Sequence, residues 1–272
     1  MRKMAKLVCG ADNKRWLKRV REMTVHAGEK RLTGRIAREK IRHMSVPRPQ
    51  EGVVARFLAL GDPCGVISDA MDEIGVPPGV VGASVLRPTI PGRVVVGPAL
   101  TVRNILQRVN PLDGAKSHAN KMAEFEAHNL ALPGDVLVIQ GVSNMSNMGG
   151  ISAQTGKRQG EAGAIVMGGV RDIAHSRAVD YPMWTSEITP STGKWRLETV
   201  EINGDIQIGE VRVCCGDLVV ADDTGICFIP RDMILAVLEA AEKKSRAEEI
   251  RCKAIDDGLP VPDIARASYG EK

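Results

Sequence analysis

The amino-acid sequence predicts an α/β fold in one large domain, preceded by a basic N-terminal extension. Segments with helical periodicity alternate with short apolar runs, and two of these runs, residues 135–140 and 164–167, have the length of strands covered on both faces. The 272 residues are 43% hydrophobic and 26% charged, as in ordinary globular proteins. A chain of this length has room for a substantial core.

Charge divides the chain into two parts. Residues 1–50 contain 15 Lys and Arg against 4 Asp and Glu, whereas the remainder contains 22 against 29. Within the first part, residues 13–23 carry three apolar side chains at helical spacing, which predicts a short amphipathic helix. Two prolines at positions 47 and 49 predict a linker. We therefore place a basic extension at residues 1–50 and a folded domain at 51–272. The extension could bind a polyanion, steer an anionic ligand or simply be solvated.

Composition argues against several classes of protein. No apolar stretch approaches the about 18–20 residues needed to cross a bilayer, and the N-terminus lacks the apolar core of a secretory signal. The six cysteines show no CxxC spacing, and Cys214 and Cys215 are adjacent, which predicts a reduced, cytoplasmic protein. Aromatic residues make up 3% of the chain, too few for the stacking platforms that bind single-stranded nucleic acid. We therefore expect neither a membrane nor a nucleic acid as a partner.

The elements of the domain follow from periodicity and from turn residues. The expected helices are residues 53–60, 66–74, 114–131, 151–160, 172–179 and 232–255, the last with Asp232 as its N-cap. The expected strands are residues 93–102, interrupted by a Gly-Pro pair, then 135–140 and 164–167. Several short strands are expected over 199–230.

Residues suited to chemistry are concentrated between positions 133 and 172. One strand leads into a glycine- and asparagine-rich loop at 141–150 and then into a helix, and the next strand ends near Arg171 and Asp172. Ligands of α/β sheets bind at the carboxyl ends of strands. The amides at the start of the helix could hold a carboxylate or phosphate, Arg171 could form a fork onto an anionic oxygen, and Asp172 could bind Mg²⁺ or Mn²⁺. Alternatively, Asp172 could cap its helix while Arg171 forms a surface ion pair.

Five motifs carry a resemblance to a known family. They are Ile-Ser-Asp-Ala-Met-Asp at 67–72, Val-Gly-Pro-Ala-Leu-Thr-Val at 96–102, Pro-Gly-Asp-Val-Leu-Val-Ile at 133–139, Gly-Gly-Val-Arg-Asp at 168–172 and Gly-Asp-Leu-Val-Val-Ala-Asp-Asp at 216–223. In this order the chain resembles the RraA-like proteins from about residue 53 to residue 250. That family includes the class II 4-hydroxy-4-methyl-2-oxoglutarate/4-carboxy-4-hydroxy-2-oxoadipate aldolases.

The resemblance implies a β/β/α swivelling-domain-like fold, assembled as a trimer or a dimer of trimers with active sites between subunits. It also implies a lyase that needs Mg²⁺ or Mn²⁺, releases pyruvate from a 2-oxo acid and can decarboxylate oxaloacetate. Asp172 then corresponds to the metal-binding aspartate and Arg171 to the catalytic arginine beside the substrate's keto oxygen. A carboxylate from a neighbouring subunit, Glu248 or Glu249, would complete the water shell of the metal. The turn whose amides take the substrate carboxylate corresponds to Gly149, Gly150, Ile151 and Ser152.

One position departs from the aldolase pattern. The aldolases place Glu or Asp 21 residues before the arginine, where this chain has Gly150. Asn144, Asn147 or Gln154 could replace that carboxylate as a hydrogen-bond partner, although none can act as a base. Decarboxylation needs an electron sink and no base, so it should survive this change better than aldol cleavage.

Two further interpretations are compatible with the sequence. His175, one turn after Arg171, could carry a proton or be an exposed helix residue. The chain could also be an RraA-like regulator that binds a ribonuclease or another protein without catalysis, or a lyase with altered chemistry. Metal dependence separates the enzyme from the regulator, because turnover would stop in EDTA while binding to a protein partner would continue.

Overall fold

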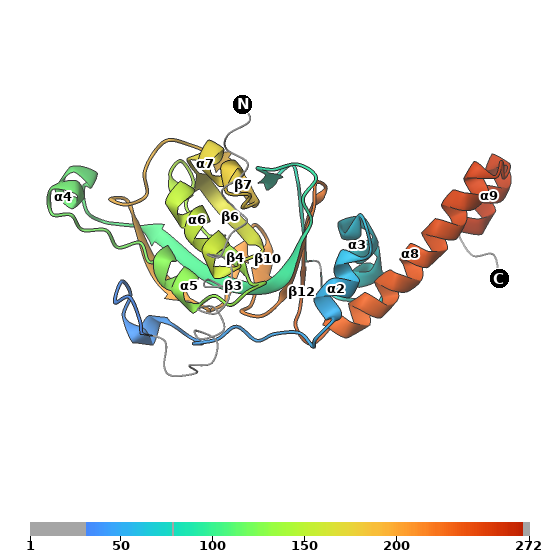
Figure 1. Ribbon diagram of the computed structural model, residues 1–272, viewed down its shortest axis with the longest axis horizontal. Coiled ribbons are helices and arrows are strands. Elements are labelled where there is room, and N and C mark those ends of the chain that lie inside the picture. Colours follow the sequence, from blue (N-terminus) through green and yellow to red (C-terminus); the bar gives the residue numbers. More distant parts are fainter. Residues whose placement is uncertain (1–30, 78, 269–272) are drawn as a thin grey trace, which may run out of the picture. The chain divides into compact units, whose positions relative to one another are not determined.

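The computed structural model describes residues 31–77 and 79–268 (Figure 1). The helix expected at residues 13–23 lies outside these described residues. The helical elements are η1 (Arg38–Lys40), α2 (Val53–Leu58), α3 (Pro63–Glu73), α4 (Pro111–Lys116), α5 (Glu124–Leu130), α6 (Gly150–Gln159), α7 (Ile173–Ala178), α8 (Ile234–Asp256) and α9 (Val261–Ser268). The strands are β1 (Val80–Gly82), β2 (Arg87–Pro88), β3 (Val95–Leu106), β4 (Val136–Gln140), β5 (Ser146–Met148), β6 (Gly163–Val170), β7 (Met183–Ile188), β8 (Leu197–Ile202), β9 (Ile206–Ile208), β10 (Val211–Val213), β11 (Leu218–Ala221) and β12 (Gly225–Ile229).

A ten-stranded sheet, counted within the described residues, organises the fold and confirms the predicted α/β class. Its main path runs β1-β12-β11-β3-β4-β6-β7-β2, with β5 added to β6 and β8 added to β3. The long strand β3 joins two parts, because it pairs antiparallel with β11 along its first residues and parallel with β4 further on. The parallel part, β3-β4-β6-β7, brings several carboxyl ends to one edge, where ligands usually bind.

The Gly-Pro pair does not interrupt β3, contrary to the sequence prediction. Pro98 stays in register opposite Leu218 of β11, at the point where β3 changes its hydrogen-bonding partner. Gly97 is needed for a different reason: a Cβ atom there would lie 2.0 Å from the carbonyl oxygen of Gly134. The two residues therefore mark a close approach of chains and a change of partner within one strand.

Strand β4 is covered on both faces, as its continuous apolar run predicts. Val136 and Val138 belong to a core that includes Ile206 and Ile208 of the β9–β10 ribbon. The alternate residues, such as Leu137, are also fully buried. Helices α5, α6 and α7 lie on the face opposite to that ribbon in Figure 1. Burial of both faces fixes the register of β4 and hence the edge to which its loop is delivered.

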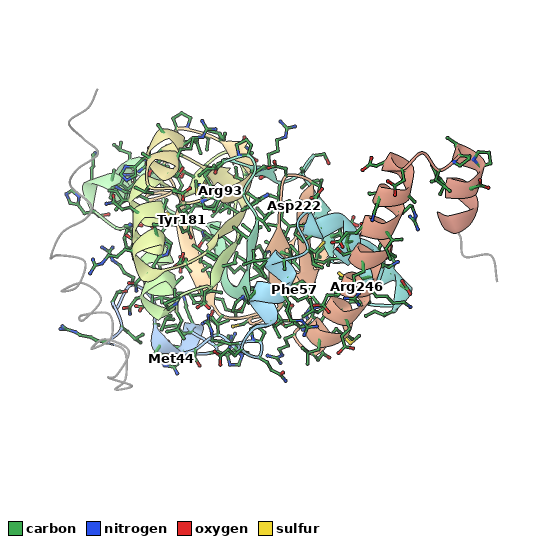
Figure 2. All side chains as sticks on the ribbon, turned by 45° about the vertical axis from the view of Figure 1, so that its right-hand side comes forward. Met44, Phe57, Arg93, Tyr181, Asp222 and Arg246 are labelled. Atoms are coloured by element: carbon green, nitrogen blue, oxygen red, sulfur yellow. The ribbon has the colours of Figure 1, made fainter. Side chains whose placement is uncertain are left out.

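A second core covers the antiparallel part of the sheet. Phe57 of α2, labelled in Figure 2, is fully buried together with Ile67 of α3 and Leu238 of α8. Burial in α8 ends at Ala241, and the remainder of that helix is largely exposed. Asp232 is not the N-cap, because Met233 occupies that position without a side-chain hydrogen bond. Among the described residues, no helix is long and apolar enough to span a membrane.

The single helix predicted at residues 114–131 is wrong, since two short helices, α4 and α5, replace it. His118 takes a left-handed conformation with φ of 53° just after α4, which ends the first helix. Thr199 of β8 then holds the connection in place, because its hydroxyl accepts the amide of Ala123 and its own amide donates to the carbonyl of Lys121. A tertiary contact of this kind overrides helical periodicity.

The compact unit that contains the sheet begins at Thr33 rather than at Glu51. We call residues 33–50 the N-terminal strap. Ile41 is buried and forms a parallel bridge with Ile202 of β8, and Val46 is also buried. Arg42 donates to Glu201 at 2.5 Å, and Arg48 forms an ion pair with the fully buried Asp135. These two arginines of the basic extension are thus paired with carboxylates of the domain itself.

Replacing Arg48 by methionine should lower the free energy of unfolding by about 1–2 kcal/mol at pH 7, because Asp135 loses its ion-pair partner. Burial raises the pKa of Asp135, and Arg48 opposes that rise. Without Arg48 the pKa in the folded state climbs further above that in the unfolded state. The folded state then binds the proton more tightly, so stability falls as pH rises through the folded pKa.

The destabilisation should therefore be smaller at pH 5 than at pH 7, which urea denaturation at both pH values would measure. Arg93→Met is the matched control, because Arg93 pairs with Asp180 where both side chains are about half exposed. That variant should change stability by less than about 1 kcal/mol. An equal loss at both pH values for Arg48→Met would contradict the assignment.

Candidate active site at the carboxyl end of β6

The candidate site is formed where β6 ends beside the start of α6. Strand β5 pairs parallel with the end of β6, and the amide of Arg171 donates to the carbonyl of Met148 at 3.1 Å. This pairing sets Gly149 directly against the Arg171-Asp172 turn. A Cβ atom on Gly149 would lie 2.9 Å from Oδ2 of Asp172 and 3.2 Å from Nε of Arg171. Glycine at this position therefore permits the close approach of the two segments.

Asp172 holds a left-handed backbone conformation, with φ of 57° and ψ of 42°. Its carboxylate accepts a hydrogen bond from the amide of Gly150 at 3.1 Å and lies 3.4 Å from Nε of Arg171. Asp172 occupies the N-cap position of α7, as one interpretation of the sequence expects, but its side chain makes no capping hydrogen bond to that helix. Aspartate adopts this left-handed conformation more readily than most other residues, and here its carboxylate stays about half exposed.

The first turn of α6 presents free amide groups to the same place. The amide of Gly150 is taken by Asp172, and that of Ala153 donates to the carbonyl of Gly149. In the described part of the chain, the amides of Ile151 and Ser152 have no acceptor. Unpaired amides at a helix N-terminus are the kind of group that can hold an anion such as a carboxylate. The structure thus brings together Arg171, Asp172 and the four turn residues that the resemblance indicates.

Gly150 is enclosed by the side chain of His175. A Cβ atom on Gly150 would lie 2.8 Å from Cβ and Cγ of His175 and 3.0 Å from Cβ of Asp172. No larger side chain fits at position 150 unless His175 moves. The imidazole is exposed, and its Nε2 lies 2.9 Å from Oε1 of Gln154. The absence of an acid at position 150 is therefore matched by a histidine that occupies the space beside it.

The three candidates for replacing that acid differ in their surroundings. Asn147 is fully buried and uses its amide to organise the loop: it donates to the carbonyls of Val142 and Met145 and accepts the amide of Val142. Gln154 faces His175. The backbone amide of Asn144 donates to Glu187 at 2.6 Å. Both polar groups of the Asn147 side chain therefore form hydrogen bonds within the loop.

Sequence reasoning missed a carboxylate and a buried histidine near the site. Glu187 lies on β7 in register with Gly169, two residues before Arg171. The strand itself was not anticipated, so no signal pointed to Glu187. His128 on α5 contacts the side chain of Ser152 from inside the protein. The sequence offers one sign of this contact: His128 lies among apolar residues of the helix predicted at 114–131, as a buried histidine with a polar partner would.

Glu248 is exposed on the second half of α8, as is its neighbour Glu249. Figure 1 places that half of the helix away from α6 and α7. Within one chain, therefore, neither carboxylate reaches the candidate site.

The donor set at the site suits a hard cation that keeps most of its water. No cluster of three or more His, Cys, Asp or Glu side chains that could enclose a metal occurs among the described residues. Mg²⁺ and Mn²⁺ do not require one, because Mg²⁺ is often held by one or two carboxylates together with waters and substrate oxygens. The half-exposed carboxylate of Asp172, beside a free anion-binding turn, fits that requirement.

Comparisons with known proteins identify the family and the fold. The model of the RraA-like family, described as Aldolase/RraA, matches residues 65–228. A Halalkalibacterium halodurans protein named "Putative 4-hydroxy-4-methyl-2-oxoglutarate aldolase" is 32% identical over 221 residues, which are 80% of this chain and 94% of that protein.

Two solved structures share the fold. An uncharacterized protein from Pseudomonas syringae pv. tomato matches with a TM-score of 0.66 and 22% identity, covering 82% of this chain and all of that one. Streptomyces coelicolor RraAS2, described as an unusual member of the RNase ES inhibitor RraA protein family, matches with a TM-score of 0.63 and 26% identity, covering 75% and 97% of the two chains. The fold implied by the sequence motifs is confirmed, and the chain belongs to the RraA-like family.

Proposed function

We propose that this protein is a divalent-metal-dependent lyase that releases pyruvate from a 2-oxo acid, by retro-aldol cleavage of a 4-hydroxy-2-oxo acid, by decarboxylation of oxaloacetate, or by both. The observation that carries this proposal is the convergence of three groups at the end of β6. These groups are the carboxylate of Asp172, the guanidinium of Arg171 and the free amides at the start of α6. The similarity to a protein named as an aldolase supports the same class of reaction.

Each group has a separate task in the proposed reaction. The amides of Ile151 and Ser152 bind the substrate's C1 carboxylate, as helix N-termini bind anions. Arg171 donates to the C2 oxygen and stabilises the negative charge that develops there when the bond at C3 breaks. Asp172 would hold Mg²⁺ or Mn²⁺, which supplies Lewis-acid stabilisation of the same charge. Gly149 and Gly150 keep the turn narrow enough for these groups to act on one small molecule.

The lack of a carboxylate at position 150 determines which of the two reactions is favoured. Retro-aldol cleavage needs a base that removes the proton of the C4 hydroxyl, whereas loss of CO₂ from oxaloacetate needs stabilisation of the remaining negative charge alone. His175 fills the space beside Gly150, and Asn147 is buried within the loop. We therefore propose that decarboxylation is retained more fully than aldol cleavage.

Assembly would complete the site. We propose a homo-trimer or a dimer of trimers in which Glu248 or Glu249 of a second copy approaches Asp172. The exposed second half of α8 supports this proposal, because it carries both carboxylates and the exposed apolar residues Ile250 and Ile255.

A second candidate function is regulation of a ribonuclease or another protein without catalysis. The observation that favours it is the similarity to the Streptomyces coelicolor protein, which is described as a member of an RNase inhibitor family. The strap argues for a protein partner rather than RNA, because Lys40, Arg42 and Arg48 are already paired with Glu198, Glu201 and Asp135.

Pyruvate release tests the two functions directly. Oxaloacetate and a 4-hydroxy-2-oxo-dicarboxylate are each supplied with Mg²⁺ or with EDTA, and pyruvate is followed through lactate dehydrogenase and NADH. We expect Mg²⁺-dependent release, faster with oxaloacetate, above the rate without enzyme. Release that is equal in EDTA would overturn the metal-dependent mechanism. No release from either substrate would favour the regulator.

A further inference from the structure

A buried chain of hydrogen bonds lies behind the anion-binding turn. Nε2 of His128 is 2.7 Å from Oγ of Ser152, and Nδ1 of the same ring is 2.7 Å from Oε1 of Glu161. The hydroxyl of Tyr181, labelled in Figure 2, donates to Oε2 of Glu161 at 2.6 Å. The side chains of His128 and Glu161 are completely buried, and Ser152 and Tyr181 are buried as well. The mechanism above makes no use of these side chains.

The direction of the hydrogen bonds follows from the chemistry of the groups. Burial and the nearby Glu161 raise the pKa of Tyr181, so its hydroxyl keeps its proton and donates to the carboxylate. The carboxylate of Glu161 accepts, so Nδ1 of His128 carries a proton and donates to it, while Nε2 on the other side of the ring is in hydrogen-bond contact with the hydroxyl of Ser152.

This series of buried hydrogen bonds holds α6 at two points that are one turn apart. At the first point the ring of His128 forms a buried hydrogen bond with the hydroxyl of Ser152. At the second point Gly156 allows close packing, because a Cβ atom there would lie 2.5 Å from Oε2 of Glu161 and 2.9 Å from the hydroxyl oxygen of Tyr181. The free amide of Ser152 belongs to the same residue as the anchored hydroxyl, so the anchor also sets the direction of this amide.

We infer that His128 is a positioning residue: through the hydroxyl of Ser152 it orients the amides of Ile151 and Ser152 that bind the carboxylate of the substrate. This inference rests on the proposed function. The carboxylate is bound equally before and during bond cleavage, so a misplaced amide weakens ground-state and transition-state binding alike. Such a change raises KM and leaves kcat unaltered, whereas partial unfolding lowers the apparent kcat at constant KM.

Two substitutions of His128 separate positioning from stability. An asparagine amide reaches the place of Nδ1, so His128→Asn keeps a donor to Glu161 and loses contact with Ser152. A glutamine amide reaches the place of Nε2, so His128→Gln keeps contact with Ser152 and loses the contact with Glu161. Ser152→Ala removes the hydroxyl itself. Thr101→Val is the matched control, because it deletes another buried hydroxyl, which donates to the carbonyl of Gly204 at 2.6 Å far along the chain from this turn.

The experiment measures KM and kcat for oxaloacetate with saturating Mg²⁺, pyruvate binding by calorimetry, and thermal stability for the parent, the four single variants and the double variant His128→Asn/Ser152→Ala. We expect KM and the pyruvate Kd to rise about tenfold in Ser152→Ala and His128→Asn, with kcat within about twofold of the parent. His128→Gln and Thr101→Val should keep the parent KM although their stability falls. The double variant His128→Asn/Ser152→Ala should be no worse in KM than either single variant.

The results distinguish failure of the positioning role from failure of the proposed function. If the parent turns over oxaloacetate but KM in Ser152→Ala and His128→Asn equals that of Thr101→Val, the positioning role is overturned and the proposed function stands. A rise in KM for His128→Gln as large as that for His128→Asn would also overturn it, because stability rather than contact with Ser152 would then govern KM. If the parent neither binds pyruvate nor turns over either substrate, the proposed function falls, and this inference falls with it.

Discussion

Replacing Arg171 by alanine is expected to lower kcat for pyruvate release about 10²–10³-fold, the range found when one donor to a developing negative charge is removed. The ion-pair contact of the guanidinium is with Asp172 at 3.4 Å, and the side chain is 30% exposed. Its removal therefore leaves no buried group without a partner. We expect the loss to appear in catalysis, with little change in thermal stability.

Arg171→Lys and Arg158→Ala make this measurement specific. Lysine keeps the positive charge but lacks the planar fork of arginine, so Arg171→Lys should recover part of the rate. Arg158 is exposed in the last turn of α6, at the end opposite to the candidate site, and Arg158→Ala should behave as the parent. Turnover of Arg171→Ala at the parent rate would remove Arg171 from the mechanism and leave the ion pair with Asp172 as its role.

The elements that carry the site were predictable because their signals are local. The apolar run of β4, the glycine-rich loop and the Arg171-Asp172 pair at the end of β6 each lie within a few residues, and the parallel pairing of β4 with β6 brings their carboxyl ends together. The motif resemblance placed the same residues in one site. The positions of Gly149 and Gly150 gain their explanation from the structure, since it is the side chains of Asp172, Arg171 and His175 that exclude a Cβ atom there.

The elements that were missed depend on contacts distant in sequence. The split between α4 and α5 is enforced by Thr199, 76 residues from Ala123. The strap joins the domain because Arg48 reaches Asp135, 87 residues away, and because Ile41 pairs with Ile202. A basic, proline-containing segment gives no local sign of such partners. The same applies to His128, whose partners Ser152 and Glu161 follow it by 24 and 33 residues.

Replacing Asp172 by asparagine is expected to lower the rate of pyruvate release at a fixed Mg²⁺ concentration about 10²-fold, and to raise the Mg²⁺ concentration for half-maximal rate at least tenfold. Asparagine tolerates the left-handed conformation of this residue, and its amide oxygen can still accept the amide of Gly150. The substitution thus removes one negative charge while keeping the local backbone. A Mg²⁺ titration of the rate measures both effects.

Asp180→Asn is the matched control, because Asp180 also has positive φ, 53°, and forms an exposed ion pair with Arg93. The same change of charge in the same backbone conformation, near the start of β6 rather than its carboxyl end, should leave the Mg²⁺ dependence as in the parent. Asp172→Ala should show the catalytic loss of Asp172→Asn together with about 1–2 kcal/mol of lost stability, because alanine pays the cost of the left-handed conformation. If Asp172→Asn and Asp180→Asn gave the same Mg²⁺ titration, the carboxylate of Asp172 would hold the turn through Gly150 and would not be the metal ligand.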